Sequence, residues 1–272
     1  MPIVLLQSVA IYTITSDLGK ENYLTAIVKG CIYERNPSAK IIEISSDVVA
    51  FDVYQTTYLF KSAYHYFPKG THHFILSGLY NTDFQNLLIA EYDGHFIYFT
   101  DNGFASLALP KDIKIGAVKL DNQFSFQIGN IAKAFAEASF FINKGTFIDA
   151  FTTPYTLQYQ PIDIDLIVRN NELVAQVLFI DRFKNVVINL TKDEFENYRN
   201  GRNFTIEFIG KEKINAISNS YSDVTHGRKL CFFNNAGYME LAVRGGNASE
   251  LFGFETGEQV DDIYKTIKIF FE

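Results

Sequence analysis

One carboxylate stands where it could bind a ribose. Asp17 lies in the segment Thr-Ser-Asp-Leu-Gly at positions 15–19, between an apolar run and the start of a helical pattern. A carboxylate directly after a strand can accept hydrogen bonds from both ribose hydroxyls, as the acidic residue of dinucleotide-binding folds does. The same side chain could instead cap the following helix by accepting from its first backbone N–H groups. The segment alone leaves both interpretations open.

Three positions in the second half of the chain could contact a flat base. Asn185 lies in a turn between two apolar runs, and its amide offers the donors and the acceptor that match an adenine edge. Tyr221 offers a ring on which a base could stack. Gly245, the first of two adjacent glycines, permits close backbone approach to a planar ligand. Each also has a structural explanation, because asparagine and glycine form turns and tyrosine packs in cores.

The histidines and cysteines do not form a metal-binding set. Cys31 and Cys231 are far apart in the sequence, so they give neither a disulfide framework nor a paired-cysteine metal motif. Neighbouring residues of a strand point to opposite faces, so His72 and His73 cannot chelate one ion together. The other histidines are His65, His95 and His226. We therefore expect no metal site and no cofactor.

The composition is that of a folded chain, and it excludes several classes of function. The chain has 272 residues, 47% hydrophobic and 20% charged, which leaves room for two domains. A net charge of −7 argues against nucleic acid as a partner, because that binding draws on clustered Lys and Arg. The apolar runs are shorter than the roughly 18 residues of a membrane span. The opening segment 1–19 lacks the basic residues of a signal peptide, so we interpret it as a buried strand of a cytoplasmic protein with no membrane partner.

The first half of the chain alternates strand and helix patterns. The predicted elements are strands at 11–15, 40–44 and 73–77, helices at 21–34 and after Asp52 as N-cap, a hairpin at 87–100 around Asp93-Gly94, and a helix at 131–142. This rhythm predicts a mainly parallel sheet with helices covering it. Ligands of such sheets gather at the carboxyl ends of the strands, and Asp17 lies at such an end.

After Pro154 and Pro161 the pattern changes to short strands separated by turns. The predicted strands are at 174–180, 186–189, 204–209, 230–234 and 238–243. Such a series is typical of a small antiparallel barrel or sandwich. We predict an N-terminal α/β domain over residues 1–160, a linker over 161–171 and a C-terminal β-barrel domain over 172–272.

In this order, the motifs resemble those of the S-adenosylmethionine (SAM) hydroxide adenosyltransferase family, the adenosine-forming hydrolases related to the 5′-fluoro- and 5′-chloroadenosine synthases. The resemblance runs from Ile11 to Gly253. Further segments in family order are 36–37, 41–48, 51–53, 66–71 and 101–103. The resemblance implies an α/β domain and a β-barrel domain, SAM or adenosine as substrate or ligand, and a homotrimer with the ligand between domains of neighbouring subunits.

The resemblance extends to the residues that hold the nucleoside. It matches Asp17 with the carboxylate that binds the ribose, and Phe51 with an aromatic side chain packed near the nucleoside. Asn185 matches the residue at the adenine edge, and Tyr221 matches the ring that stacks on the base. Gly245 matches a position whose backbone meets the adenine. The nucleoside half of the family site is therefore expected to be complete.

The residues expected to handle the attacking water differ from the family pattern. Family hydrolases carry Asp-Pro-Gly-Val-Gly and an Arg pair after the third strand, and later Phe-His-Gly-Arg-Asp, whose Asp, Arg and His hold that water. Gly78, Gln85 and Gln127 occupy the three positions here, and neither glycine nor a neutral amide can act as a general base.

The resemblance also places Asp181 and Asn235 where relatives hold the amino-acid end of the substrate.

Four functions stay open. An active enzyme would use water to displace methionine from C5′ of SAM and release adenosine, with Asp83 either as a substitute base or as a turn former. A chain that keeps the binding positions without the triad could instead be a non-catalytic adenosine or SAM sensor. Halide-dependent adenosyl transfer needs no base, but the short stretch 85–101 lacks the inserted loop of the fluorinating branch. A purely structural trimer would fill its ligand space with bulky Leu79, Tyr80 or Phe84.

Overall fold

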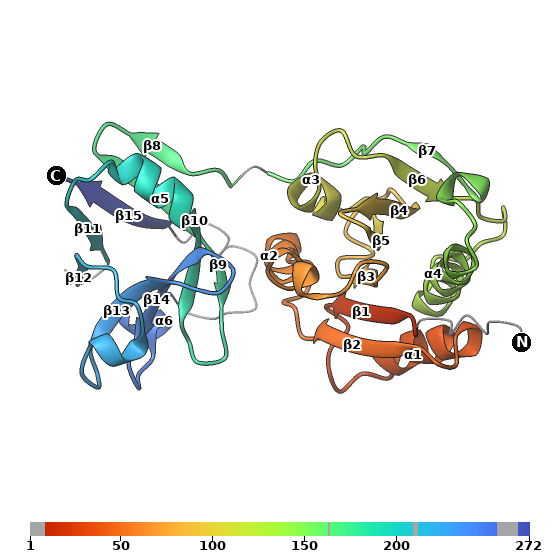
Figure 1. Cartoon of the computed structure of the whole chain (residues 1–272), viewed down its shortest axis with the longest axis horizontal. Coiled ribbons are helices and arrows are strands. Elements are labelled where there is room, and N and C mark those ends of the chain that lie inside the picture. The colour runs from red at the N-terminus through yellow and green to blue at the C-terminus, as the bar shows by residue number, and fades with distance from the viewer. Residues whose placement is uncertain (1–8, 163, 209–211, 255–265) are drawn as a thin grey trace, which may run out of the picture. The chain divides into compact units, whose positions relative to one another are not determined.

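The computed structural model describes residues 9–162, 164–208, 212–254 and 266–272 (Figure 1). The chain divides into two compact units, Met1–Pro161 and Ile162–Glu272. The first unit holds a seven-stranded sheet and the second an eight-stranded one. The predicted fold class, an α/β domain followed by an antiparallel β domain, is confirmed. The part of the expected opening strand that precedes Val9 lies outside the described residues.

The sheet of the first unit is parallel in one half and antiparallel in the other, with the order β2-β1-β3-β5-β4-β6-β7. The parallel strands are β1 (Ile11–Ser16), β2 (Lys40–Ser45), β3 (His72–Leu76) and β5 (His95–Thr100). The antiparallel strands are β4 (Leu87–Tyr92), β6 (Ile115–Val118) and β7 (Thr152–Tyr155). The carboxyl ends of β1, β3 and β5 therefore lie along one edge.

Helices cover both faces of this sheet. They are α1 (Tyr23–Arg35), α2 (Val53–Ala63), α3 (Phe104–Ala108) and α4 (Ile128–Asn143). Residues of α1 and α4 share a core cluster with Phe74, whereas residues of α2 and α3 share another with Ile75. Phe74 and Ile75 enter different clusters because successive side chains of a strand point to opposite faces. Burial on both faces explains why β3 lacks an alternating apolar pattern.

Polar side chains cap the N-terminal ends of α1 and α2. Asn22 caps α1 by accepting from the Leu24 N–H at 3.2 Å, and Asp52 caps α2 by accepting from the Gln55 N–H at 2.8 Å. The predicted cap at Asp52 is confirmed. Asp17 does not cap α1, so the interpretation of Asp17 as a helix cap is wrong.

The hairpin of β4 and β5 forms as predicted. Asp93 and Gly94 both have positive φ, 49° and 71°, which matches the twist of the flanking strands. The sequence patterns do not predict β6, β7 or α3. Within the described residues, no helix combines the length and the apolar character that a membrane crossing requires.

The sheet of the second unit is antiparallel, with the order β12-β11-β15-β9-β10-β14-β13 and with β8 beside β9. Its strands are β8 (Ile167–Arg169), β9 (Glu172–Ile180), β10 (Val186–Thr191), β11 (Phe204–Glu207), β12 (Lys213–Ile214), β13 (Lys229–Phe233), β14 (Tyr238–Val243) and β15 (Thr266–Phe271). Strand β8 lies within the stretch 161–171 for which the sequence predicts a linker. Residue 209, the last of a predicted strand, lies outside the described residues.

One apolar core fills the second unit, and short helices flank its sheet. The core includes Phe195 of α5 (Lys192–Arg199) and Phe252, which follows α6 (Ala248–Leu251). Helix α5 starts with a capping box in which the side chains of Thr191 and Glu194 each accept from the other's backbone N–H. A 3₁₀ turn over Tyr221–Asp223 precedes β13.

Candidate functional site

Asp17 lies at the carboxyl end of β1, where its carboxylate joins three segments of the first unit. Its Oδ2 atom accepts from the backbone N–H of Phe51 at 3.0 Å and from that of Gly78 at 2.9 Å. Phe51 precedes the cap of α2, and Gly78 follows β3. No residue in the described part of the chain donates to Oδ1 of Asp17. The site therefore presents one carboxylate oxygen that can accept from a ligand hydroxyl.

Phe51 has a backbone conformation that non-glycine residues seldom adopt. Its φ is 65°, and its side chain is 54% exposed. The hydrogen bond from its N–H to Asp17 holds this conformation. Burial raises the pKa of the neighbouring Asp52, the cap of α2, although the Gln55 N–H opposes that rise. An exposed aromatic residue in a constrained conformation therefore lies in the loop that Asp17 anchors.

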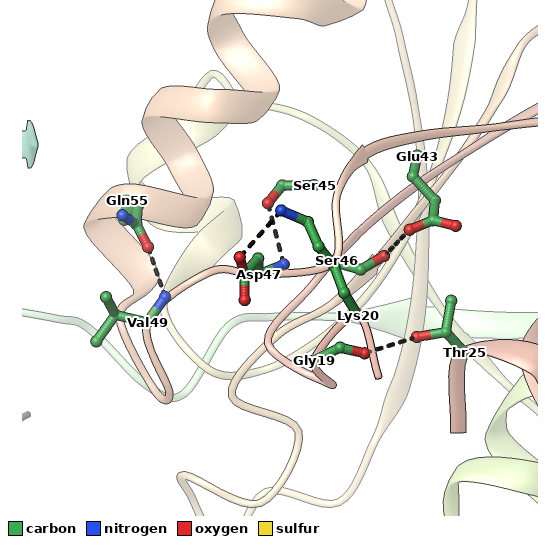
Figure 2. Close-up of polar contacts among 9 residues, drawn as sticks. All are labelled: Gly19, Lys20, Thr25, Glu43, Ser45, Ser46, Asp47, Val49 and Gln55. Atoms are coloured by element: carbon green, nitrogen blue, oxygen red, sulfur yellow. Dashed lines mark hydrogen bonds and ion pairs between the residues drawn. The ribbon is translucent and has the colours of Figure 1, made fainter. Parts of the chain in front are cut away.

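The loop after β2 is joined to the loop after β1 (Figure 2). The Gly19 N–H donates to the carbonyl of Ser46 at 2.8 Å. Figure 2 shows that the Lys20 ammonium lies 3.0 Å from Oδ2 of Asp47, and that the Thr25 hydroxyl donates to the carbonyl of Gly19 at 3.5 Å. Farther along, the Val49 N–H donates to Oε1 of Gln55 on α2 at 2.6 Å. These bonds fix the path of the chain that leads to Phe51.

Asn102 and Asp101, which follow β5, brace the same edge of the sheet. Nδ2 of Asn102 donates to the carbonyl of Ser77 at 2.6 Å. The Asp101 carboxylate, 1% exposed, accepts from the Tyr155 hydroxyl at 2.9 Å and from the Gln158 N–H at 2.8 Å. Asp101 thus holds the chain that follows β7, while Asn102 holds the residue before Gly78.

The three positions expected to have lost the water-holding residues carry no side chain that accepts a proton near neutral pH. Gly78 is buried, whereas Gln85 and Gln127 are exposed. Neither glutamine side chain hydrogen-bonds another described residue. The segments that carry them do meet, because the ring of Tyr80 packs edge-on against Phe126 with their centroids 6.1 Å apart.

The bulky residues of the altered loop differ in burial. Leu79 is 6% exposed and joins the core cluster of α1 and α4, whereas Tyr80 is 57% exposed and Phe84 is half-buried. Asp83 is exposed, and its carbonyl accepts from the Gln85 N–H at 3.0 Å. The backbone thus turns tightly here, but the Asp83 carboxylate bonds no described residue, so both interpretations of Asp83 stay open.

In the second unit, polar side chains from several segments meet around Asn185, and we name this set the Asn185 cluster. Asn185 precedes β10 and is 4% exposed. Its Nδ2 lies 3.1 Å from Oδ2 of Asp181, 2.7 Å from the Tyr221 hydroxyl and 3.0 Å from Oε1 of Glu240. The Tyr221 hydroxyl donates to the same Oε1 at 3.1 Å. Three residues singled out from the sequence, Asp181, Asn185 and Tyr221, are therefore neighbours.

Glu240 is the member of the Asn185 cluster that the sequence analysis misses. It lies on β14, and its Oε2 accepts from Nδ2 of Asn234 at 3.2 Å. Burial is the largest cause that raises the pKa of Glu240. Burial and the Glu240 carboxylate also raise the pKa of Tyr221. One feature of the sequence does point to Glu240, because it is the single carboxylate within the otherwise apolar run Tyr-Met-Glu-Leu-Ala-Val.

Two other residues singled out from the sequence lie outside these hydrogen bonds. Asn235 is exposed, and its side chain bonds no other described residue, whereas the preceding Asn234 reaches Glu240. Gly245 has φ 70°, and a Cβ there would collide with the ring of His226. The close approach that glycine permits at this position is therefore made by the His226 ring.

The buried histidines belong to the core of the first unit. His72 bonds the Tyr98 hydroxyl through Nδ1 at 2.7 Å, whereas His73 bonds Oγ1 of Thr13 at 2.7 Å and Nδ1 of His95 at 3.1 Å. The prediction that His72 and His73 point to opposite faces is confirmed by these separate partners. Among the described residues, no three His, Cys, Asp or Glu side chains are grouped so that they could hold a metal ion.

A groove of about 700 Å³ opens between α4 and the segment 118–125 of the first unit. Its lining includes Phe124, Lys133 and Phe141. None of the residues proposed to bind a nucleoside lines this groove, so it is separate from the site around Asp17.

Comparisons with known proteins agree with the resemblance seen in the sequence. Residues 12–154 match the family model described as the SAM hydroxide adenosyltransferase N-terminal domain, and residues 175–261 match the model of its C-terminal domain. The chain is 26% identical over 268 residues to the (R)-S-adenosyl-L-methionine hydrolase of Methanocaldococcus jannaschii, covering 93% of this chain and 96% of the relative.

Two solved structures share the fold. An uncharacterized conserved protein from Thermotoga maritima superposes with a TM-score of 0.78 at 20% identity, covering 95% of this chain and 99% of the other. A conserved hypothetical protein from Thermus thermophilus superposes with a TM-score of 0.68 at 19% identity, covering 97% of this chain and 100% of the other. At such identities these two structures support the fold alone.

Proposed function

Because the chain belongs to the SAM hydroxide adenosyltransferase family, we propose that it binds SAM or adenosine. The observation that carries the proposal is the Asp17 carboxylate, whose Oδ2 holds Phe51 and Gly78 while Oδ1 accepts from no described residue. Ribose hydroxyls are donors that suit such an oxygen. The similarity to a SAM hydrolase supports an adenosyl ligand.

For the base, the proposal uses the Asn185 cluster. Asn185 meets the adenine edge, and Tyr221, 40% exposed, offers its ring for stacking. The ring of Tyr221 is already held by an edge-on contact with Phe232 at 5.1 Å and by its hydroxyl bond to Glu240. Binding therefore loses little side-chain entropy at this position.

The assembly we propose is a homotrimer, with the ligand between domains of neighbouring subunits, as the family resemblance implies. One chain has a mass of 31.0 kDa, so light scattering in solution should give three times that value. A monomer mass at micromolar concentration would reject the proposed assembly.

The reaction we propose for SAM is slow hydrolysis. Water attacks C5′ in line with the sulfonium, so that a C5′–O bond forms as the C5′–S bond breaks. The electron pair of the broken bond stays on sulfur, methionine leaves as a neutral thioether, and the proton of the water passes to solvent. Without a general base at Gly78, Gln85 or Gln127, the rate is expected to fall by ~10² to 10⁴ relative to a site with the base.

The second candidate is a binding protein without catalysis. The observation that favours it is the absence of a proton acceptor at the same three positions, beside a carboxylate and an amide that could still hold a nucleoside. A sensor of this kind binds adenosine or SAM with measurable heat and releases no product.

The experiment that tests both candidates follows one sample in two ways. We would titrate adenosine and SAM by calorimetry, then incubate the protein with SAM and chromatograph for adenosine and methionine in equal amounts. Product above a blank without protein supports the hydrolase, and binding heat without product supports the sensor. No heat with either ligand would reject the proposed function altogether.

A further inference from the structure

The side-chain amide of Asn185 has a fixed direction. Two of the three atoms around its Nδ2 are carboxylate oxygens, Oδ2 of Asp181 at 3.1 Å and Oε1 of Glu240 at 3.0 Å. An ionised carboxylate accepts hydrogen bonds and donates none, so only the NH₂ end of the amide can face it. The oxygen Oδ1 of Asn185 therefore lies on the opposite side of the amide, where no described residue donates to it.

The fold holds Glu240 in this place through the sheet. Strands β10 and β14 pair with Val187 opposite Glu240, and Asn185 lies two residues before Val187. The two oxygens of Glu240 accept from Asn185, Tyr221 and Asn234, none of which carries a positive charge. The pKa of Glu240 is raised, with burial as the largest cause. The carboxylate is thus built into the cluster.

We propose that Asp181 and Glu240 make this site specific for a 6-aminopurine by presenting Oδ1 of Asn185 to the ligand. The inference rests on the proposed function, in which Asn185 meets the adenine edge. The exocyclic amine of adenine donates to Oδ1, whereas the 6-oxo group of hypoxanthine brings a second acceptor against it. An acceptor that faces another acceptor at a buried edge leaves both without a donor.

The expected size of the effect follows from that mismatch. Adenosine should bind the wild-type protein about 10-fold to 100-fold more tightly than inosine, the range expected for one buried polar group left unpaired. In the variant Asp181→Asn with Glu240→Gln, both neighbours can donate as well as accept. The Asn185 amide can then turn over, and the ratio of the two dissociation constants should fall toward one.

The experiment measures four dissociation constants by calorimetry, for adenosine and inosine with the wild-type chain and with the double variant. Glu196→Gln on the exposed side of α5 is the matched control, and its ratio should equal that of the wild type. Circular dichroism establishes that each variant is folded. Because these nucleosides lack the amino-acid end of SAM, any contact of Asp181 with that end does not enter the comparison.

The outcomes separate the inference from the function on which it rests. A preference for adenosine in the wild type that the double variant loses supports the inference. Equal binding of both nucleosides by the wild type, or an unchanged ratio in a folded double variant, overturns the inference and leaves the proposed function intact. If the double variant does not fold, Glu240→Gln alone must lower the ratio at least twofold, or the inference is rejected. Binding of neither nucleoside by the wild type rejects both.

Discussion

The backbone N–H of Gly78 donates to the carboxylate of Asp17 at 2.9 Å, although 61 positions separate the two residues in the sequence. Position 78, two residues after β3, therefore contributes a backbone group and no side chain to the edge where Asp17 lies. The same carboxylate oxygen holds Phe51. Oδ2 of Asp17 thus stabilises the fold, whereas Oδ1 can accept from a ligand. A substitution that tests ligand binding must therefore keep an acceptor for the N–H groups of Phe51 and Gly78.

Replacing Asp17 with asparagine should weaken nucleoside binding and leave the fold nearly unchanged. The amide oxygen can still accept from Phe51 and Gly78, but the charge-assisted bond to a ribose hydroxyl is lost. We expect the dissociation constant of adenosine to rise about tenfold, since hydrogen bonds to charged groups are worth roughly 1 kcal/mol more than neutral ones. Calorimetry with adenosine and with 2′-deoxyadenosine measures this change.

The deoxynucleoside gives that experiment its control. If Asp17 binds the ribose, the wild type should prefer adenosine over 2′-deoxyadenosine, and Asp17→Asn should reduce that preference. The exposed Asp112→Asn, in the same unit, should leave both constants unchanged. Equal loss of affinity for both nucleosides in Asp17→Asn would show that Asp17 does not contact the 2′-hydroxyl, and it would assign the loss to the 3′-hydroxyl, which both nucleosides carry, or to the loop of Phe51.

The sequence predicts the elements whose signals lie within a few neighbouring residues. It misses elements that depend on pairing with residues far away in the chain. The N-cap at Asp52 and the turn at Asp93-Gly94 follow from residues within a few positions of each other. By contrast, β7 contains Pro154, which ordinarily argues against a strand and is tolerated here at the edge of the sheet. Strand β15 is an exception, because the alternation of polar and apolar residues in Thr-Ile-Lys-Ile is local.

The candidate site shows the same division. Asp17 could be singled out because it directly follows a strand, yet its contact with Gly78 depends on the parallel pairing of β1 and β3. Glu240 could not be tied to Asn185 from spacing, because the two residues are 55 positions apart and meet only through the pairing of β10 and β14. Sequence reasoning therefore finds candidate chemistry, and the sheet register decides which candidates meet.

The buried histidines predict a loss of stability in acid. Burial lowers the pKa of His72 to about 4 and that of His73 to about 3, so both stay neutral in the folded chain at pH values where the unfolded chain is already protonated. The two histidines therefore do not lower the free energy of unfolding above about pH 6.5, and they lower it progressively as the pH falls toward 4. We expect the free energy of unfolding, measured with urea, to drop by on the order of 1 kcal/mol per pH unit for each histidine in that window.

A variant identifies the source of this pH dependence. His73→Gln removes one titrating group, so its free energy of unfolding should change less steeply between pH 6.5 and 4, whatever its stability at pH 7. The exposed His65→Gln should keep the slope of the wild type. An unchanged slope in His73→Gln would assign the acid sensitivity to other groups.

The preference for adenosine over inosine should itself depend on pH. The pKa of Glu240 is raised above its ordinary value, chiefly by burial, so this carboxylate gains its proton earlier than an exposed glutamate as the pH falls. A protonated Glu240 can donate and no longer requires the NH₂ end of Asn185, so only the Asp181 carboxylate then fixes the amide. The ratio of dissociation constants should be constant at pH 8 to 7 and decline in acid, whereas the Asp181→Asn, Glu240→Gln variant should show a flat profile.

Restoring the three altered positions should increase hydrolysis of SAM. The variant Gly78→Asp, Gln85→Arg, Gln127→His places the family's water-holding side chains on this chain, and general-base assistance is worth ~10² to 10⁴ in rate. Gly78 has φ 60°, and a Cβ there would lie 3.4 Å from Nδ2 of Asn102, so we expect a loss of stability of about 1–3 kcal/mol. Adenosine released per hour, measured by chromatography, is compared with the same triple variant carrying Gly78→Asn, which has the same shape and no carboxylate. A gain that the asparagine version shares would mean that the carboxylate at position 78 is not the proton acceptor that limits this site.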